Sequence, residues 1–368
     1  MKTEVAVMNG TEQDIKFIER AGNILKQGGL VAFPTETVYG LGGDALNKES
    51  SRKIYDAKGR PSDNPLIVHI ADMEMLEEIV EEIPKTAEKL AARYWPGPLT
   101  MILHKSEKVP YETTGGLETV AVRMPAHPTA LSLIRAAGGY VAAPSANTSG
   151  KPSPTEARFV KEDMDGRIDM ILDGGMVGIG LESTIIDLTE KVPMILRPGY
   201  ITKEMLEDTL NMPVVLDKTI LREDTRQAPR APGMKYRHYA PQGELTIIAG
   251  EEKKVVAFIN ERTEEQHING EKVGVIGTEE TAALYNADSV KSAGNRKDEK
   301  TVARELYRIL REFDEEKVTV IYSEAFDDTG LGQAIMNRLL KAAGHHIEYV
   351  DEKKEKRHTD KDGRTEGK

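Results

Sequence analysis

The sequence Leu30-Val-Ala-Phe-Pro-Thr-Glu-Thr-Val-Tyr-Gly-Leu-Gly-Gly-Asp44 determines how the first half of the chain folds. Its apolar start, Leu30 to Phe33, predicts a buried strand that ends at Pro34, because proline cannot donate a hydrogen bond to a neighbouring strand. Polar residues follow at the strand end, where α/β sheets place their ligands. The three glycines between positions 40 and 43 predict a tight turn or a close approach of the backbone to another group. The stretch therefore predicts a ligand site at the end of this strand.

Two cations come shortly before the next apolar run. Lys58 and Arg60 precede Leu66 to Ile70, which predicts a second buried strand. A cationic pair beside a glycine-rich segment suits a phosphate or a carboxylate. Each feature alone is more typical of an ordinary turn or a solvated surface, since short motifs produce many false matches. Their position between two apolar strands is what favours a ligand site.

The composition indicates two domains. A chain of 368 residues exceeds a comfortable single core. It has 39% hydrophobic and 30% charged residues and no apolar run of the roughly 18–20 residues that span a bilayer, so we expect a cytoplasmic protein without membrane contact. The absence of cysteine excludes disulfides and thiolate metal sites. A formal net charge of −11 argues against a broad nucleic-acid-binding face, so no stable nucleic-acid binding is expected.

Four segments differ in their patterns. Residues 1–213 combine short apolar runs with irregularly spaced helical patterns, which predicts an α/β domain with a mixed sheet. Residues 214–243 lose this periodicity and are interpreted as a linker, whose aromatic and basic residues could close over an active site. Residues 244–350 alternate strands and helices, which predicts a smaller doubly wound, Rossmann-like α/β domain. Residues 351–368 are almost wholly charged or small and polar, which predicts a disordered tail.

Individual elements follow from the same patterns. Short apolar runs, most of them rich in Val and Ile, predict strands at 30–33, 66–70, 99–103, 119–123, 140–143, 170–172, 184–188 and 194–196, and then at 245–249, 273–276 and 318–322. Helical spacing of apolar residues predicts helices at 11–27, 50–57, 202–210, 302–313 and 331–343, and a pair within 73–93 broken at Pro84.

Further polar residues follow predicted strands. Ala143-Pro-Ser-Ala-Asn-Thr-Ser-Gly150 offers hydrogen bonds without bulk, although a turn held by Ser and Asn side chains explains the same pattern. Arg123 and Arg197 each end a strand and could clamp an anion, or could simply be surface charges. The candidate phosphate-binding side chains are Lys58, Arg60, Arg123, Arg197, Thr37, Thr119, Ser145, Ser153 and Ser183.

Familiar catalytic signatures are missing from the sequence. No segment fits the P-loop or the dinucleotide fingerprint, and no Ser-His-Asp order stands out, so catalysis would depend on positioning and charge stabilisation. His69 ends an apolar run, where a histidine is more often structural than an acid or base. Asp173 and Glu182 could reach a magnesium ion, but neither is assigned, and the metal ligands stay unknown.

The chain resembles the YrdC-like family over most of its length. The nucleotide-binding region of that family is similar to Pro34-Thr-Glu-Thr-Val-Tyr-Gly-Leu41 together with Lys58-Gly-Arg-Pro61 and Asp63-Asn-Pro-Leu66. Further segments that carry the resemblance are Trp95-Pro-Gly-Pro-Leu-Thr100, Val122-Arg-Met-Pro-Ala-His127, 143–150, Pro152-Ser-Pro-Thr155, Glu182-Ser-Thr184, Leu196-Arg-Pro-Gly199 and Ala231-Pro-Gly-Met-Lys-Tyr-Arg-His-Tyr-Ala-Pro241. With its additional C-terminal region the chain resembles the two-domain threonylcarbamoyl-AMP synthases of this family.

This resemblance implies a YrdC-like twisted mixed sheet in a catalytic domain, and a nucleotidyltransferase activity. The implied substrates are L-threonine, bicarbonate or CO2, and ATP with Mg²⁺, and the products are L-threonylcarbamoyl-AMP and pyrophosphate. The adenylate would pass to a tRNA threonylcarbamoyltransferase complex for threonylcarbamoyladenosine formation in tRNA.

The resemblance also implies roles for individual residues. L-Threonine would be held by Thr37, His69, Arg123, Ser183 and the backbone of Ala143. ATP would be held by Arg60, Asn64, Thr119, Ser145, Ser153, Arg197 and Tyr239. Lys58 and Arg60 would be catalytic through charge stabilisation. One departure is Ala231, where a serine is common in the family.

Two other functions are compatible with YrdC-like motifs. One is an RNA-binding module of tRNA metabolism, which the net charge of −11 disfavours because such a module needs a continuous basic face. The other is carbamoyl transfer from carbamoyl phosphate, in proteins that embed this domain among zinc-binding modules. The missing cysteines argue against that arrangement.

Overall fold

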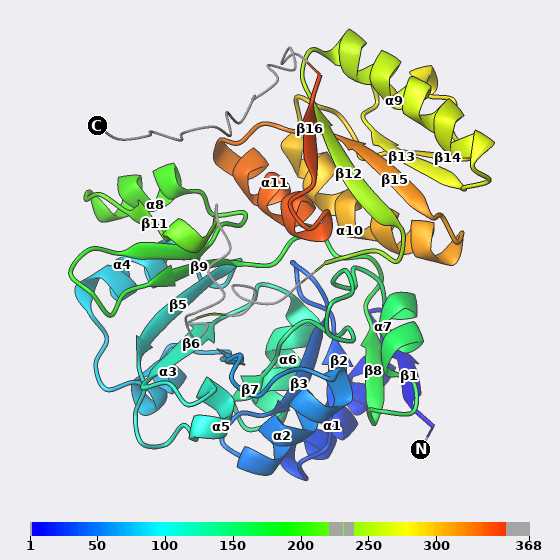
Figure 1. Cartoon of the computed structure of the whole chain (residues 1–368). Helices are drawn as coiled ribbons and strands as arrows, with labels where there is room; N and C mark the ends of the chain where they lie inside the picture. The colour runs from blue at the N-terminus through cyan, green and yellow to red at the C-terminus, as the bar shows by residue number, and fades with distance from the viewer. Residues whose placement is uncertain (1, 221–230, 232–238, 351–368) are drawn as a thin grey trace, which may run out of the picture.

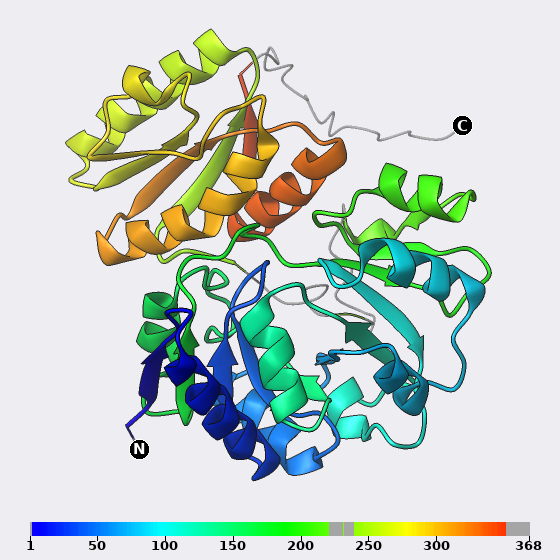
Figure 2. The same ribbon diagram turned by 180° about the vertical axis from the view of Figure 1, so that it is seen from behind.

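The computed structural model describes residues 2–220, 231 and 239–350, which form two α/β units (Figure 1). Residues 221–230 and 232–238 of the predicted linker, and the predicted tail 351–368, lie outside the described residues. Figures 1 and 2 show the second unit against one end of the first, with α10 (Glu299–Glu315) and α11 (Gly330–Ala342) on its inner side. Within the described part of the chain, no helix has both the length and the apolar character that a bilayer crossing requires.

The first unit is built on a mixed sheet. Its strands are β1 (Glu4–Val7), β2 (Val31–Phe33), β3 (Gly40–Asp44), β4 (Ile67–His69), β5 (Leu99–His104), β6 (Thr119–Arg123), β7 (Val141–Ala142), β8 (Met170–Asp173), β9 (Thr184–Asp187), β10 (Met194–Arg197) and β11 (Val215–Leu216). They form one sheet of 11 strands in the order β1-β8-β2-β3-β7-β4-β6-β5-β9-β10-β11. The sheet continues beyond residue 213, because β11 pairs with β10.

Helices cover both faces of this sheet, because strands such as β2 are apolar on both sides. Val31 and Phe33 belong to one hydrophobic cluster with α1 and α6, whereas Ala32 belongs to another with Ile54 of α2. Such two-sided burial is typical of strands sandwiched between helices. The helices are α1 (Glu12–Lys26), α2 (Lys48–Lys58), α3 (Glu74–Ile79), α4 (Lys85–Tyr94), α5 (Tyr111–Thr114), α6 (Pro128–Ala136), α7 (Ala157–Met164) and α8 (Lys203–Leu210).

The glycines after the first buried strand form a strand themselves. The predicted turn is wrong, since Gly40–Asp44 is β3 and runs antiparallel to β2. A Cβ atom at Gly42 would lie 2.9 Å from Val141 Cγ1 and 3.0 Å from Phe33 Cε1. The close approach that glycine permits is therefore real, and it lets the backbone of β3 lie directly against Val141 and Phe33.

The second unit is a small doubly wound domain, as the alternating pattern predicts. Its strands β12 (Glu244–Ala249), β13 (Val273–Gly277), β14 (Ser289–Ser292), β15 (Val320–Glu324) and β16 (Ile347–Tyr349) are all parallel, in the order β14-β13-β15-β12-β16. α9 (Glu252–Ile268) packs on one face, and α10 and α11 pack on the other. The predicted strands of both units match the structure to within two residues at each end. β1, β11, β14, β16 and the helices α5, α6, α7 and α9 were not predicted.

The two units meet through buried polar contacts. Arg311 of α10 donates from Nη2 to Asp163 Oδ2 of α7 over 2.7 Å, and the two side chains are 1% and 0% exposed. Arg311 also donates to the carbonyl oxygen of Pro152. Gly180 lies so close to α10 that a Cβ atom there would be 2.5 Å from the carbonyl oxygen of Ala303. The absence of a side chain at Gly180 thus permits this close approach of α10.

Gly180→Ala should therefore force the units apart. Both Gly180 and Gly175 have left-handed backbones, with φ of +86° and +79°, but a Cβ at Gly175 meets nothing within 4 Å. Gly175→Ala thus serves as the control for backbone strain alone. We expect Gly180→Ala to lower the free energy of unfolding, measured by urea denaturation, by about 1–3 kcal/mol more than Gly175→Ala. Equal losses would show that the contact with α10 is not tight.

Candidate active site

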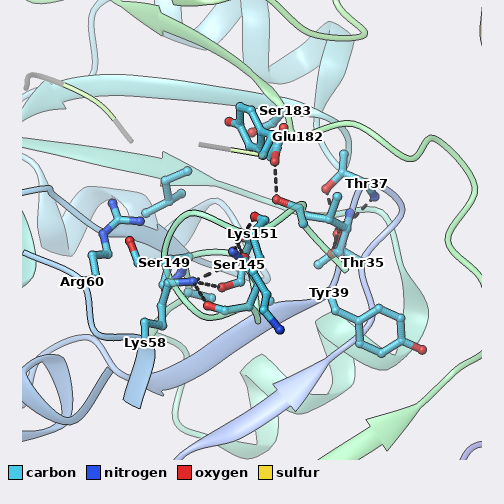
Figure 3. Close-up of a pocket in the computed structure, with 18 of the residues that line it drawn as sticks. Thr35, Thr37, Tyr39, Lys58, Arg60, Ser145, Ser149, Lys151, Glu182 and Ser183 are labelled. Carbon is cyan, nitrogen blue, oxygen red and sulfur yellow. Dashed lines mark hydrogen bonds between the residues drawn. The ribbon is translucent and has the colours of Figure 1, made fainter. Parts of the chain in front are cut away.

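A cavity enclosing about 690 Å³ of empty space, part of it open to solvent, lies at strand ends of the large sheet (Figure 3). The residues that line it include five with cationic side chains, Lys58, Arg60, Arg123, Lys151 and Arg197, and eight that carry hydroxyl groups, Thr35, Thr37, Tyr39, Ser145, Ser149, Ser153, Ser183 and Tyr239. A cavity with so many cations suits a ligand that carries several negative charges.

Most of the predicted site residues line this one cavity. They are Thr37, Lys58, Arg60, His69, Arg123, Ala143, Ser145, Ser153, Ser183, Arg197 and Tyr239. Asn64 and Thr119 do not line it. Asn64 is buried beside Arg60, which donates to its carbonyl oxygen, and Thr119 begins the strand that Arg123 ends. The predicted roles of these two residues stay predictions.

His69 and Arg123 are brought together by a parallel strand pair. They end β4 and β6, and the register places them opposite each other. Arg123 is 4% exposed and donates from Nη1 to Thr37 Oγ1 over 3.0 Å. Its Nη2 forms an ion pair of 2.6 Å with Glu36 Oε1. Because a buried charge is costly unless paired, Glu36 makes it possible to hold Arg123 at the cavity wall.

His69 is neutral at physiological pH. Its Nδ1 lies 3.1 Å from the carbonyl oxygen of Ile67, and the side chain is buried. Burial, and then the charge of Arg123, lower the pKa of His69 to about 3. His69 can therefore hydrogen-bond a ligand without adding a positive charge.

Lys58 and Arg60 are placed by the end of α2. Lys58 is its last residue, and the left-handed Gly59 turns the chain so that Arg60 also faces the cavity (Figure 3). Lys58 Nζ donates to the carbonyl oxygens of Ser145 and Asn147, each over 2.5 Å. Burial, and then the charge of Arg60, lower the pKa of Lys58 well below its ordinary value. Burial also lowers the pKa of Arg60 to about 10, which leaves it charged at neutral pH.

Arg197 and Ser183 meet because β9 and β10 are antiparallel. The end of β10 therefore lies beside the start of β9. Arg197 Nε donates to the carbonyl oxygen of Ser183 over 3.1 Å, and its Nη2 donates to Ser183 Oγ over 3.2 Å. Ser183 Oγ is also 2.8 Å from Thr100 Oγ1. Burial lowers the pKa of Arg197.

Glu182 joins the cavity wall to the second unit. Its Oε1 accepts from Ser153 Oγ over 2.5 Å, and its Oε2 accepts from Tyr307 and Arg338, each over 3.0 Å. Asp173, the other carboxylate considered for magnesium, accepts from the backbone N–H of Gly175. Within the described residues, no three His, Cys, Asp or Glu side chains gather where they could hold a metal ion.

Tyr239 both lines the cavity and packs between the units. Its ring lies 5.2 Å from that of Tyr307, and it belongs to the same hydrophobic cluster as Val38 and Leu181 of the first unit. The backbone of Tyr239 is left-handed, with φ of +65°. The interpretation of residues 214–243 as a closing segment stays a prediction, because residues 221–230 and 232–238 lie outside the described range.

Several polar lining residues were not predicted as site residues. Thr35 and Tyr39 belong to the polar stretch after the first buried strand, and Asn147 and Ser149 belong to the segment 143–150. Because these four residues lie within motifs that the sequence analysis had singled out, the sequence could have indicated them as site residues. Lys151 carried no such signal, because its position depends on an ion pair with Asp163, which only the folded chain brings close.

Comparisons with known proteins agree with this architecture. A family model of the Sua5, YciO and YrdC type, described as telomere recombination, matches residues 23–199, and one described as threonylcarbamoyl-AMP synthase, C-terminal domain, matches residues 201–344. The threonylcarbamoyl-AMP synthase of Bacillus subtilis is 52% identical over 331 residues, which cover 90% of this chain and 94% of that protein. The synthase of Pyrococcus abyssi is 51% identical over 334 residues, which cover 90% and 95%.

A solved structure has the same fold over nearly the whole chain. The crystal structure of P. abyssi Sua5 complexed with L-threonine has a TM-score of 0.88 and 46% identity, and the match covers 95% of this chain and 99% of that one. Fold and cavity define a two-domain YrdC-type α/β protein with a cationic ligand site. The chain belongs to the Sua5 family of threonylcarbamoyl-AMP synthases.

The buried neutral histidine should make stability depend on pH. Because its folded pKa of about 3 is below the unfolded value of about 6.5, the unfolded chain binds one more proton between these values. The contribution of neutral His69 to the free energy of unfolding is thus fully present above about pH 6.5 and is lost as the pH falls toward 3. We expect His69→Gln to reduce the slope of unfolding free energy against pH by up to about 1.4 kcal/mol per unit, in urea titrations between about pH 4.5 and 6.5. An unchanged slope would mean that folded His69 titrates normally.

Proposed function

We propose that this protein forms L-threonylcarbamoyl-AMP and pyrophosphate from L-threonine, bicarbonate or CO2, and ATP. The observation that supports this most is the gathering of Lys58, Arg60, Arg123 and Arg197 around one cavity. ATP brings a triphosphate and threonine brings a carboxylate, so the two substrates together require several cations. The membership of the family and the L-threonine in the P. abyssi structure support the same substrates.

The chemistry needs a site that positions two anionic reactants and excludes water. The threonine amine attacks CO2 and loses a proton, which gives a carbamate. A carbamate oxygen then attacks the α-phosphorus of ATP, and the bond from that phosphorus to the pyrophosphate oxygen breaks. The carbamate is unstable in water, so a buried cavity protects it. Neither step needs a covalent enzyme intermediate, which fits catalysis by positioning and charge stabilisation.

Threonine would bind at the side of the cavity that Thr37, His69 and Arg123 form, with Ser183 and the backbone of Ala143 nearby. Arg123 is already oriented by Thr37 and Glu36, so its guanidinium would meet the substrate carboxylate without rearranging. Neutral His69 would add a hydrogen bond and no second charge.

ATP would bind at the side that the other cations form. Arg60 and Arg197 would contact the phosphates, and Lys58 would stabilise the charge that develops on phosphate and carbamate oxygens. Ser145, Ser153 and Tyr239 border the same space, and Asn64 and Thr119 would reach the more distant parts of the nucleotide. Lys58 is held by two carbonyl oxygens, which fixes its position before a ligand arrives.

Magnesium would enter as part of the MgATP substrate. Mg²⁺ usually keeps several waters and binds substrate phosphates with only one or two carboxylates. The oxygens of Glu182 already accept hydrogen bonds from Ser153, Tyr307 and Arg338. Phosphate oxygens and water would therefore supply most of the ligands. The product would pass to a tRNA threonylcarbamoyltransferase complex for the modification of tRNA.

The assignment predicts a strict dependence on both small substrates. Release of pyrophosphate from ATP should require L-threonine and bicarbonate together, because the attacking oxygen belongs to the carbamate that these two form. A coupled pyrophosphate assay with each substrate omitted in turn measures this. Equal release without threonine would refute the proposed reaction.

Arg60→Ala should weaken ATP binding while the fold is retained. Loss of one charge-assisted contact costs on the order of 1.5–3 kcal/mol of binding free energy. Arg52→Ala is the matched control, since Arg52 lies on α2, the helix just before Arg60, but its side chain is 53% exposed and pairs with Glu49 and Glu112. Isothermal titration with MgATP would show the difference. Equal ATP affinities of the two variants would mean that Arg60 only shapes the turn.

A further inference from the structure

The second unit places two side chains directly behind the cavity wall. Arg338 of α11 is 0% exposed, and Tyr307 of α10 is equally buried. Both donate hydrogen bonds to Glu182 Oε2 over 3.0 Å. Glu182 itself lines the cavity of the first unit. The wall of the candidate active site is therefore completed by residues more than 120 positions away in the sequence.

Three contacts of this pair reach the side of the cavity assigned to ATP. Arg338 and Tyr307 hold Glu182, and Glu182 in turn holds Ser153, whose Oγ donates to Glu182 Oε1 over 2.5 Å. Arg338 Nη1 donates to the carbonyl oxygen of Pro198 over 2.6 Å, immediately after Arg197 in the chain. The ring of Tyr307 packs against that of Tyr239.

The side assigned to threonine has different supports. Thr37 is held by Thr35 and Arg123, and Arg123 is held by Glu36 and the carbonyl oxygen of Gly97. His69 contacts the carbonyl oxygen of Ile67. All of these partners belong to the first unit. The hydrogen bonds of Arg338 and Tyr307 at the cavity wall go to Glu182 and Pro198, and Ser183, which follows Glu182, is the threonine-side residue nearest to them in the chain.

Stability alone is a weak reason for such an arrangement. A buried ion pair loses so much hydration that apolar residues of similar volume often stabilise a fold as well or better. A buried pair does fix geometry, because removing either partner leaves an uncompensated charge. Although burial opposes ionisation of both groups, their mutual attraction lowers the pKa of Glu182 and raises that of Arg338. Both groups are therefore charged at neutral pH.

We propose that Arg338 and Tyr307 are positioning residues through which the second unit orders the ATP half of the active site. They act through Glu182 on Ser153, through Pro198 on Arg197, and through ring packing on Tyr239. This role rests on the proposed function, which assigns one half of the cavity to ATP and the other to threonine. The binding of each substrate can nevertheless be measured without turnover.

The test compares two tyrosine variants that make the same chemical change. Tyr307→Phe removes the hydroxyl that contacts Glu182 and keeps the ring against Tyr239. Tyr285→Phe is the matched control, because Tyr285 is also buried in the second unit and donates over 2.7 Å to a buried carboxylate, that of Glu324, on the α9 side of its sheet. Arg338→Met, which retains the length of the side chain but not its charge, provides the stronger perturbation.

Titration calorimetry with MgATP and, separately, with L-threonine measures the dissociation constant of each ligand. The test is how much each variant weakens ATP binding compared with threonine binding, and thermal melting shows whether the variant is folded. We expect Arg338→Met to weaken ATP binding by about tenfold or more and Tyr307→Phe to weaken it by several-fold, because each removes a hydrogen bond to a charged group. Threonine affinity should change by less than about twofold, and Tyr285→Phe should leave both affinities unchanged. If Arg338→Met does not fold, Tyr307→Phe decides alone.

Two results would overturn the proposal. Unchanged ATP affinity in folded Tyr307→Phe would show that the contact does not order the site. Equal weakening of ATP and threonine binding would show a general loss of structure instead of selective positioning. Failure of the wild-type protein to release pyrophosphate would refute the proposed reaction, whereas the ATP-to-threonine ratio would still test the positioning role.

Discussion

The buried carboxylate of Glu182 is the group on which the relation between the two units depends. An ionised carboxylate cannot be buried without charge-assisted hydrogen bonds. Here Ser153 supplies one from the first unit, and Tyr307 and Arg338 supply two from the second. The first unit alone would leave this charge without its cation. The second unit therefore completes the set of hydrogen bonds that holds this part of the cavity wall.

The remaining charges of the cavity follow the same logic. Arg123 is paired with Glu36, and Lys58 is held by two carbonyl oxygens, so each cation is fixed before a ligand arrives. Burial of Lys58 among carbonyl oxygens lowers its pKa, and an anionic ligand would offset part of the cost of burying its charge. Fixed cations in a cavity with little water stabilise developing negative charge more strongly than mobile ones do. The site is thus preorganised at some expense to the stability of the empty protein.

Sequence patterns were sufficient where structure depends on neighbouring residues. The strands that carry His69, Arg123 and Arg197 follow from short apolar runs, and the motifs around them named most of the cavity lining. The strand at Gly40–Asp44 was missed, because glycines that pack against Val141 and Phe33 leave no hydrophobic alternation to detect. The contact of Glu182 with Arg338 was also missed. The two residues are 156 positions apart, and nothing local marks either as a partner of the other.

The irregular order of the large sheet explains how one cavity obtains such different walls. In a regular parallel sheet, ligands meet only the carboxyl ends of strands. Here β4 and β6 run parallel and deliver His69 and Arg123 at their ends, whereas antiparallel β9 and β10 bring the start of one strand beside the end of the other. Ser183, just before β9, can therefore contact Arg197 at the end of β10. A mixed sheet lets residues that precede and follow strands share one site, and the same loop before β9 places Glu182 within reach of the second unit.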